Sequence, residues 1–502
     1  MSVSHISKSD KKVINKYIEQ HNICTPIAVI DDIIAACKLN ITKRAMTKYI
    51  TRKYENTNQS SEDDIFDTIA NMDIAHEYPH TITKHHRMRQ PQNLDTQPHP
   101  SQWIHDIQEH DELDEIHARR TQTVEYLASI EYPEQRSAGW FKMRESCITA
   151  SDGGTAIGVN KYEPQFKFIL KKVVGAPFNS NKFCYHGKKF EKVATMIYEY
   201  RANVQTLEFG LVIHKQHKFL GASPDGIVGA YKHNGEHRTN MVGRMLEIKC
   251  PLARDIKQTG EIKDHICPIY YWVQVQLQLE CCDLDECDFW QCKLFEYDSR
   301  DDFINDTNNR EPYRSKTSGF EKGCLIQMIP KDMADVLKDR SNQKYLDVIW
   351  DKAAFIYPDS IEMTPLECDT WTKQKISTLE TDYPGYVFDK VIYWRLDKSS
   401  CVLIERDTVW FANNLPILRK IWDSVEYYRA NSDMTAIMLE YIESLNVKSN
   451  KKIMNVINDL ILAKDEPFRI DTINKEIKAN KRKKLDADNI SNYVDQSDVI
   501  VC

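Results

Sequence analysis

The sequence predicts an α/β fold in which strands and helices alternate along the chain. Short apolar runs bounded by turn residues indicate buried strands at residues 245–251, 323–329 and 391–394. Apolar residues at helical spacing indicate helices, and a clear example follows His186 and continues through Val193. With 502 residues, of which 41% are hydrophobic, the chain can bury one large core plus smaller units.

The predicted strand at residues 245–251 carries two charged side chains. Glu247 and Lys249 are two positions apart, so they project from the same face of an extended strand while Ile248 packs behind it. A hairpin earlier, Asp225 follows Ser-Pro and precedes Gly-Ile-Val. A charge that faces inward without a partner is costly, so we expect these three charged side chains to share one pocket.

This set of side chains suits phosphodiester hydrolysis. Asp225 and Glu247 supply the hard oxygen ligands that Mg²⁺ prefers. A bound metal lowers the pKa of its water, and Lys249 can orient that water or offset developing negative charge. An aspartate, a gap and Glu-x-Lys on strands resemble the PD-(D/E)xK nuclease signature. The bare pattern is also typical of a surface hairpin with alternating charges, so its context decides.

Three further segments accompany the pattern in a fixed order. Upstream lie residues 140–152 (WFKMRESCITASD), which precede an expected Gly-rich turn, and residues 186–191 (HGKKFE), which open the helix. Downstream, residues 270–278 (YYWVQVQLQ) repeat glutamine with an apolar partner. The ordered set resembles the YqaJ-type viral recombinase family, whose best-known relative is the lambda exonuclease. The resemblance covers roughly residues 132–300.

The resemblance implies a PD-(D/E)xK, restriction-endonuclease-like core with a central mixed sheet flanked by helices, plus helical additions at both ends. Of the implied catalytic residues, Asp225 and Glu247 would bind the metal with the backbone carbonyl of Ile248. Glu191, on the helix beside the site, is a further candidate ligand. The full set of implied catalytic residues is Asp225, Glu247, Lys249, Glu191 and Gln274.

In lambda-type enzymes an arginine and a serine of an R-x6-S segment hold the 5′ phosphate of the DNA end, which here implies Arg144 and Ser151. A guanidinium binds phosphate bidentately. Ser151 is expected just before a helix start, where backbone amides favour anions. The alternatives are a surface ion pair for Arg144, an N-cap for Ser151, and for Gln274 with Gln276 the polar face of a half-buried element.

The implied reaction is Mg²⁺-dependent hydrolysis of double-stranded DNA from a 5′ end, with Mn²⁺ as a substitute. It leaves a 3′ single strand for viral recombination, replication or repair. The alternatives are an endonuclease or single-strand nuclease on the same core, and a DNA-end-binding recombination factor with a vestigial nuclease. The implied partners are DNA ends, a single-strand annealing protein and further copies of the chain in a ring trimer. Such proteins are common in phages and large DNA viruses, and a composition rich in Asn, Ile and Lys suits an AT-rich viral genome.

The net charge of −7 is unevenly distributed. Residues 1–55 carry ten Lys and Arg against five Asp and Glu, and residues 446–485 carry eleven against five. The basic ends are therefore candidate contacts to a phosphate backbone. Solvated basic tails without a partner are the alternative.

The lack of a recognisable targeting segment and the pattern of cysteines predict a protein inside the host cell, in its cytoplasm or nucleus. No apolar stretch approaches the ~18 residues of a membrane span, and the N-terminus lacks the apolar core of a signal peptide. The fourteen cysteines are scattered, as is usual in a reducing compartment. We expect no iron-sulfur cluster, because the cluster-like group does not match the spacing of nucleases that hold one. That group is Cys281, Cys282, Cys287 and Cys292.

Breaks in composition divide the chain into four predicted parts. Residues 1–55 form a small helical module, either a helix-turn-helix or a packing unit, and residues 56–120 a polar linker with prolines and histidines. Residues 121–433 form the nuclease domain, with a motif core at 132–300 and an extension at 301–433. Residues 434–502 form a helical, basic tail that includes a KRKK run at 481–484, either a nuclear address or solubilising charge.

Overall fold

The computed structural model describes residues 13–14, 111–133, 137–175, 180–233, 235, 238–446 and 448–497. The chain divides into two compact units, residues 1–89 and 90–502, and the second holds the predicted motifs. Apart from residues 13–14, the predicted N-terminal module lies outside the described residues, as does the predicted linker up to residue 110. The last ten residues of that linker belong to helix α6 (Asp111–Ala128).

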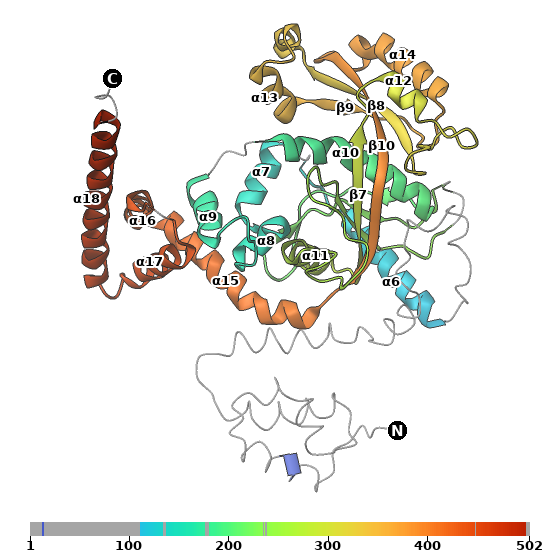
Figure 1. Ribbon diagram of the computed structural model, residues 1–502. Coiled ribbons are helices and arrows are strands. Elements are labelled where there is room, and N and C mark those ends of the chain that lie inside the picture. The colour runs from blue at the N-terminus through green and yellow to red at the C-terminus, as the bar shows by residue number, and fades with distance from the viewer. Residues whose placement is uncertain are drawn as a thin grey trace. The chain divides into compact units, whose positions relative to one another are not determined.

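A seven-stranded mixed sheet forms the centre of the second unit (Figure 1). Strands β6 and β7 run parallel, whereas the other neighbouring strands run antiparallel. The strands, in their order across the sheet, are β2 (Thr206–Leu207), β5 (Gly226–Val228), β6 (Met245–Lys249), β7 (Glu286–Glu296), β10 (Tyr386–Glu405), β8 (Lys322–Pro330) and β9 (Ala354–Ile356). The predicted α/β class with a central mixed sheet flanked by helices is confirmed.

The extension of the sheet also follows the sequence prediction. The apolar runs at residues 323–329 and 391–394 lie in β8 and β10, and β10 pairs with β7 on one side and β8 on the other. A closing helix follows as expected, although α15 (Thr408–Ala430) continues two turns beyond the pattern that ended near residue 422. The extension therefore completes one continuous sheet with the motif strands.

Alternation along β6 separates two hydrophobic clusters on opposite faces of the sheet. Met245 packs into the cluster that contains helix α11 (Ile269–Cys282), whereas Leu246 and Ile248 pack into the cluster that contains helix α10 (Lys182–Ala202). Glu247 has the same parity as Met245, so its side chain faces α11. The alternation of side chains along β6 thus directs Glu247 and Lys249 toward α11 and away from α10.

A second, three-stranded sheet carries the upstream motif. Its order is β1 (Ile148–Thr149), β4 (Leu220–Ala222) and β3 (Val212–Ile213). Strand β1 lies between α7 (Ala138–Glu145) and α8 (Ala150–Ala156); α9 (Gln165–Leu170) and the π-helical turn η4 (Lys171–Gly175) follow. The remaining helices are α12 (Arg300–Asn305), the 3₁₀ helix η5 (Lys331–Lys338), α13 (Gln343–Lys352), α14 (Pro365–Asp382), α16 (Ser432–Ser444), α17 (Asn450–Leu462) and α18 (Phe468–Ser497).

Helix α8 packs closely against α11 through two glycines. A Cβ on Gly153 would lie 2.3 Å from the Leu277 Cδ1 atom, and one on Gly154 would lie 2.8 Å from the Tyr270 Cβ atom. The expected Gly-rich turn after residue 152 is therefore wrong, because both glycines lie inside a helix. The close approach of the two helices requires glycine and overrides its low helix propensity.

The C-terminal helices share the main hydrophobic core. Met438 on α16, Ile457 on α17 and Ile473 on α18 belong to the same cluster as α11 and α15. Tyr428 on α15 donates its hydroxyl to the carbonyl oxygen of Ile457 at 2.7 Å. Helices α16 to α18 (orange to red in Figure 1) therefore pack onto the domain that carries the motifs.

Candidate active site

The β5–β6 hairpin brings the predicted carboxylates together. Pairing in the hairpin ends at Gly226 and Leu246, so Asp225 lies just before β5. The expectation that Asp225 lies on a strand is therefore wrong. The Oδ2 atom of Asp225 accepts a hydrogen bond from the backbone N–H of Ile248 at 2.7 Å. The side chain thus takes over as acceptor where the backbone ladder stops. This bond fixes Asp225 beside the strand that bears Glu247.

Glu247 is fully buried, and three side chains donate to its carboxylate. Lys249 and Gln274 both donate to Oε1, the latter at 2.7 Å, and Gln278 donates to Oε2 at 2.7 Å. An ionised carboxylate away from water needs such donors, since an unpaired buried charge is strongly unfavourable. Both oxygens of Glu247 are thereby held in one orientation.

Gln278 is a residue that the sequence reasoning missed. It lies four positions after Gln274 on α11, so both side chains project from the same face of the helix. It also lies 3.3 Å from the carbonyl oxygen of Ser223, just before Asp225. The i, i+4 spacing of the two glutamines was the available signal. Gln276 points elsewhere and binds the backbone at Glu405 and Asp407, where β10 leads into α15.

Lys249 lies among negative charge and against an aromatic ring. Its side chain is 19% exposed, and its Nζ lies 4.7 Å from the centre of the Tyr271 ring. Burial alone would lower the pKa of Lys249, but the charges of Glu247 and Asp225 outweigh it and raise that pKa. The side chain is therefore an ammonium ion at neutral pH.

The surroundings of Asp225, in contrast, disfavour its charged form. Burial raises its pKa well above the ordinary value, and the neighbouring charges of Glu247 and Glu191 raise it further. Glu191 lies on α10 and is exposed. In the described part of the chain, no three His, Cys, Asp or Glu side chains are close enough together to hold a metal ion.

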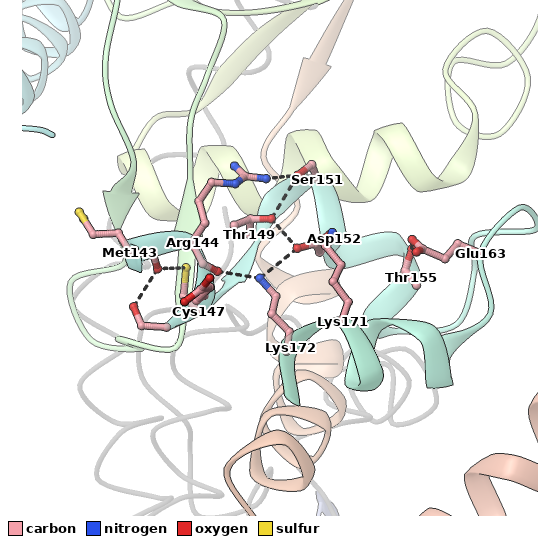
Figure 2. Close-up of polar contacts among 12 residues, drawn as sticks. Met143, Arg144, Cys147, Thr149, Ser151, Asp152, Thr155, Glu163, Lys171 and Lys172 are labelled. Atoms are coloured by element: carbon pink, nitrogen blue, oxygen red, sulfur yellow. Dashed lines mark hydrogen bonds and ion pairs between the residues drawn. The ribbon is translucent and has the colours of Figure 1, made fainter. Parts of the chain in front are cut away.

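Arg144 and Ser151, the predicted phosphate ligands, lie side by side (Figure 2). Arg144 Nη2 lies 3.4 Å from the hydroxyl oxygen of Ser151, and the guanidinium carbon lies 4.5 Å from the centre of the Trp140 ring. Helix α8 begins at Ala150, so Ser151 lies within its first turn and not before it, and its N-cap is Thr149. Ser151 is exposed, and Arg144 is half-buried.

Packing between α8 and α11 connects this pair to the carboxylates. Gly154, one turn after Ser151, abuts Tyr270 on α11. The next residue, Tyr271, holds the ammonium of Lys249 against its ring. One helix contact therefore separates the Arg144–Ser151 pair from the hairpin site.

Residues 139–285 match the family described as YqaJ-like viral recombinase domain. By this match the segment is similar to viral recombinase domains of the YqaJ type. It includes Arg144 and Ser151 at one end and Gln274 at the other, with the β5–β6 hairpin between them. The resemblance expected from the ordered motifs is thus confirmed.

Relatives of the chain occur in large DNA viruses. An uncharacterized protein of Acanthamoeba polyphaga mimivirus is 38% identical over 358 residues, which cover 70% of this chain and 63% of the relative. A protein of African swine fever virus is 28% identical over 164 residues, which cover 29% of this chain and 45% of the relative. The chain thus spans less than two thirds of the length of either relative.

Two crystal structures of an alkaline exonuclease, LHK-Exo from Laribacter hongkongensis, are also similar to the chain. The structure in complex with dAMP is 18% identical in sequence and the other 17%, each with a TM-score of 0.31. Each match covers 60% of this chain and 100% of the exonuclease.

Cysteines near the YqaJ-like domain are buried thiols. Cys281 and Cys282 end α11, and Cys287 and Cys292 lie on β7. Burial raises the pKa of Cys282 to about 12, so this thiol is protonated at neutral pH.

None of the helices in the described segments is both long and apolar enough to span a bilayer.

Proposed function

We propose that the YqaJ-like domain is a Mg²⁺-dependent deoxyribonuclease that degrades double-stranded DNA from a 5′ end. The observation that carries the proposal is the convergence of Asp225, Glu247 and Lys249 on one hairpin, with Gln274 donating to Glu247 from α11. Two acidic groups and an ammonium in one site suit the hydrolysis of a phosphodiester. The similarity to a viral recombinase domain supports the same reading.

The donor set fits a divalent cation. Burial raises the pKa of Asp225 and the charge of Glu247 raises it further, and a cation between the two carboxylates would relieve their repulsion. Both carboxylates and the carbonyl of Ile248 are oxygen donors, and an incomplete protein shell suits Mg²⁺, which keeps several of its waters. When bound, Mg²⁺ or Mn²⁺ supplies Lewis acidity and an activated water.

The remaining side chains hold this arrangement and offset charge. Gln274 and Gln278 fix the two oxygens of Glu247, so the carboxylate cannot rotate away from Asp225. Lys249, held by Glu247 and the Tyr271 ring, keeps its proton and offsets negative charge as it develops on the phosphate. Burial of Glu247 among these donors strengthens each interaction, because little water screens them.

Arg144 and Ser151 supply the preference for a DNA end. An exposed hydroxyl beside a guanidinium forms a small anion-binding pair, and stacking on Trp140 limits the motion of Arg144. A terminal 5′ phosphate bound there would set the distance from the end to the hairpin site through the α8–α11 contact.

The test uses the purified full chain with Mg²⁺ on linear duplexes with and without a 5′ phosphate, and on closed circles. The wild type should degrade phosphorylated linear ends fastest and spare circles, and EDTA should stop cleavage. Asp225→Ala or Glu247→Ala should abolish cleavage while DNA binding persists. Full activity in EDTA or in either variant would refute the metal site. Nicking of circles at rates comparable to linear DNA would favour the endonuclease, and binding without cleavage by the wild type would favour a vestigial nuclease.

A further inference from the structure

Asp152, the residue after Ser151, is the buried centre of a polar network between α7, α8 and η4 (Figure 2). Its side chain is 8% exposed. Its Oδ1 atom accepts a hydrogen bond from Lys171 Nζ at 2.8 Å. Its Oδ2 atom accepts from the Thr149 hydroxyl at 2.9 Å and lies 3.2 Å from Lys172 Nζ. One carboxylate therefore contacts three different side chains.

The first branch of the network leads to Ser151. The Thr149 hydroxyl donates its single proton to Asp152, because an ionised carboxylate only accepts. The Thr149 oxygen lies 3.1 Å from the Ser151 hydroxyl, so in this contact Ser151 donates and Thr149 accepts. The lone pairs of Ser151 face Arg144 Nη2 at 3.4 Å. In the free protein, the Thr149 contact therefore holds the Ser151 oxygen beside Arg144, and the single Ser151 proton must leave Thr149 to reach an arriving anion.

The second branch leads to the backbone of Arg144. Lys172 Nζ donates to the carbonyl oxygen of Arg144 at 2.7 Å, at the end of α7. The carbonyl oxygen of Lys172 itself accepts from Arg429 on α15 at 2.7 Å, and Arg429 also donates to the carbonyl of Glu145 at 2.8 Å. Asp152 thus reaches Arg144 through Lys172, and α15 secures the same segment from outside.

The charges of the network depend on one another. Burial lowers the pKa of Lys172, and the charge of Asp152 is the strongest influence that opposes this change. Burial would raise the pKa of Asp152, but Lys172 and Lys171 outweigh it and hold that pKa below its usual range. Without the carboxylate, a lysine whose side chain is 5% exposed would lose its counter-charge.

We propose that Asp152 is the positioning residue of the 5′-phosphate site: it orients Ser151 through Thr149 and fixes Arg144 through Lys172. The inference rests on the proposed function of Arg144 and Ser151 and assigns a further residue to it. Asp152 itself is buried behind the pair and does not touch the DNA end. It acts by holding two ligands, from two helices, at one separation before the phosphate arrives.

The test compares Asp152→Asn with a matched variant, Asp306→Asn. Asp306 is 7% exposed and accepts from the hydroxyls of Ser315, Thr317 and Tyr297, and it lies next to α12, in the extension of the domain. The readout is the ratio of kcat/KM for phosphorylated over hydroxyl ends. This ratio should fall by about ten-fold or more in Asp152→Asn, mainly through KM of the phosphorylated end, and stay at the wild-type value in Asp306→Asn.

A second variant and a binding assay keep the test decisive if Asp152→Asn folds poorly. Thr149→Val removes the hydroxyl that links Asp152 to Ser151 and keeps the ion pairs with the lysines. It should weaken the binding of a 5′-phosphorylated hairpin duplex in EDTA, measured by fluorescence anisotropy, and leave binding of the hydroxyl-ended duplex little changed.

The outcomes separate the inference from the function on which it rests. If Arg144→Ala erases the phosphate preference but folded Asp152→Asn and Thr149→Val keep it, the role of Asp152 is refuted and the phosphate site stands. If the wild type and Arg144→Ala are both indifferent to the phosphate, the phosphate site is refuted and the inference with it. An equal loss on both kinds of end in Asp152→Asn, matched by Asp306→Asn, would show a general structural effect and refute the positioning role.

Discussion

At the scale of single residues, the hairpin site is a set of charges in which each member depends on its neighbours. Glu247 is buried because Lys249, Gln274 and Gln278 donate to it, and Lys249 keeps its proton because Glu247 and Asp225 surround it. Removing one member therefore changes the protonation or the orientation of the others.

Lys249 offers a direct test of this dependence. Lys249→Ala should lower the turnover of DNA by roughly 10²–10³, since a single electrostatic group contributes about that much to a transition state, with little change in metal affinity. Lys249→Arg should not restore full activity, because a planar forked cation cannot take the place of a compact ammonium. The control is Lys263→Ala, an exposed lysine whose Nζ lies 3.9 Å from the Trp272 ring centre. Wild-type turnover in Lys249→Ala would place the lysine outside the site.

Asp152 gives a prediction about stability and pH. Its pKa is held below the usual range, so its ion pairs stabilise the fold above the ordinary carboxyl pKa of about 4 and lose this contribution as pH falls through the lowered pKa. Asp152→Asn should be less stable than wild type by about 3 kcal/mol between pH 6 and 8. This difference in the free energy of unfolding should shrink below about pH 4. Denaturant unfolding across pH 3–8 measures it, and a difference that stays constant to pH 3 would contradict the prediction.

At the scale of elements, the contact between α8 and α11 sets the geometry of the whole site. Helix α11 carries the glutamines that hold Glu247, and α8 carries Ser151. Their separation depends on Gly153 and Gly154, since a side chain at either position would meet α11. The contact between the two helices, more than any single hydrogen bond, relates the Arg144–Ser151 pair to the carboxylates.

Gly154→Ala tests this contact. Alanine favours a helix by up to about 1 kcal/mol over glycine, but its Cβ would lie 2.8 Å from the Tyr270 Cβ atom, and overpacking costs about 1–3 kcal/mol. We therefore expect net destabilisation, together with a weaker preference for phosphorylated ends. Gly187→Ala on α10 is the matched control, because its Cβ would meet nothing within 4 Å. Thermal unfolding should show opposite signs for the two variants, and equal shifts would contradict the steric argument.

At the scale of the whole molecule, the C-terminal helices complete the main core of the second unit. Buried apolar residues of α16 to α18 pack with those of α9, α11 and α15 in one cluster. Removing these helices would expose that surface. The stability of the YqaJ-like segment should therefore depend on α16 to α18, which lie far beyond its last matched residue.

Truncation after residue 433 should therefore give an insoluble or partly unfolded protein. The point variant Ile457→Ala, at a fully buried position of α17, should lower the free energy of unfolding by about 2–5 kcal/mol. Leu462→Ala on the same helix, where the side chain is 49% exposed, should change it by less than about 0.5 kcal/mol. A soluble truncated protein with wild-type melting temperature would refute the shared core.

Much of the fold could be predicted because its signals are local. The period of two along residues 245–249 placed Glu247 and Lys249 on one face, and the apolar spacing after His186 gave α10. The ordered motifs were enough to indicate the family. Each of these patterns depends on backbone geometry within one element, which a sequence carries directly.

The tertiary structure alone decided the contacts between elements. The Asp225 carboxylate lies beside β6 because the ladder ends there. Gln278 reaches Glu247 from α11, which packs against α8 and β4, and Asp152 meets Lys172 twenty residues away. In the sequence, the glycines at 153 and 154 predict a turn. In the fold, they lie in α8 and allow that helix to approach α11 closely. Such pairings depend on which faces are buried together, and the packing free energy that selects them is a property of the assembled chain, so no single segment encodes it.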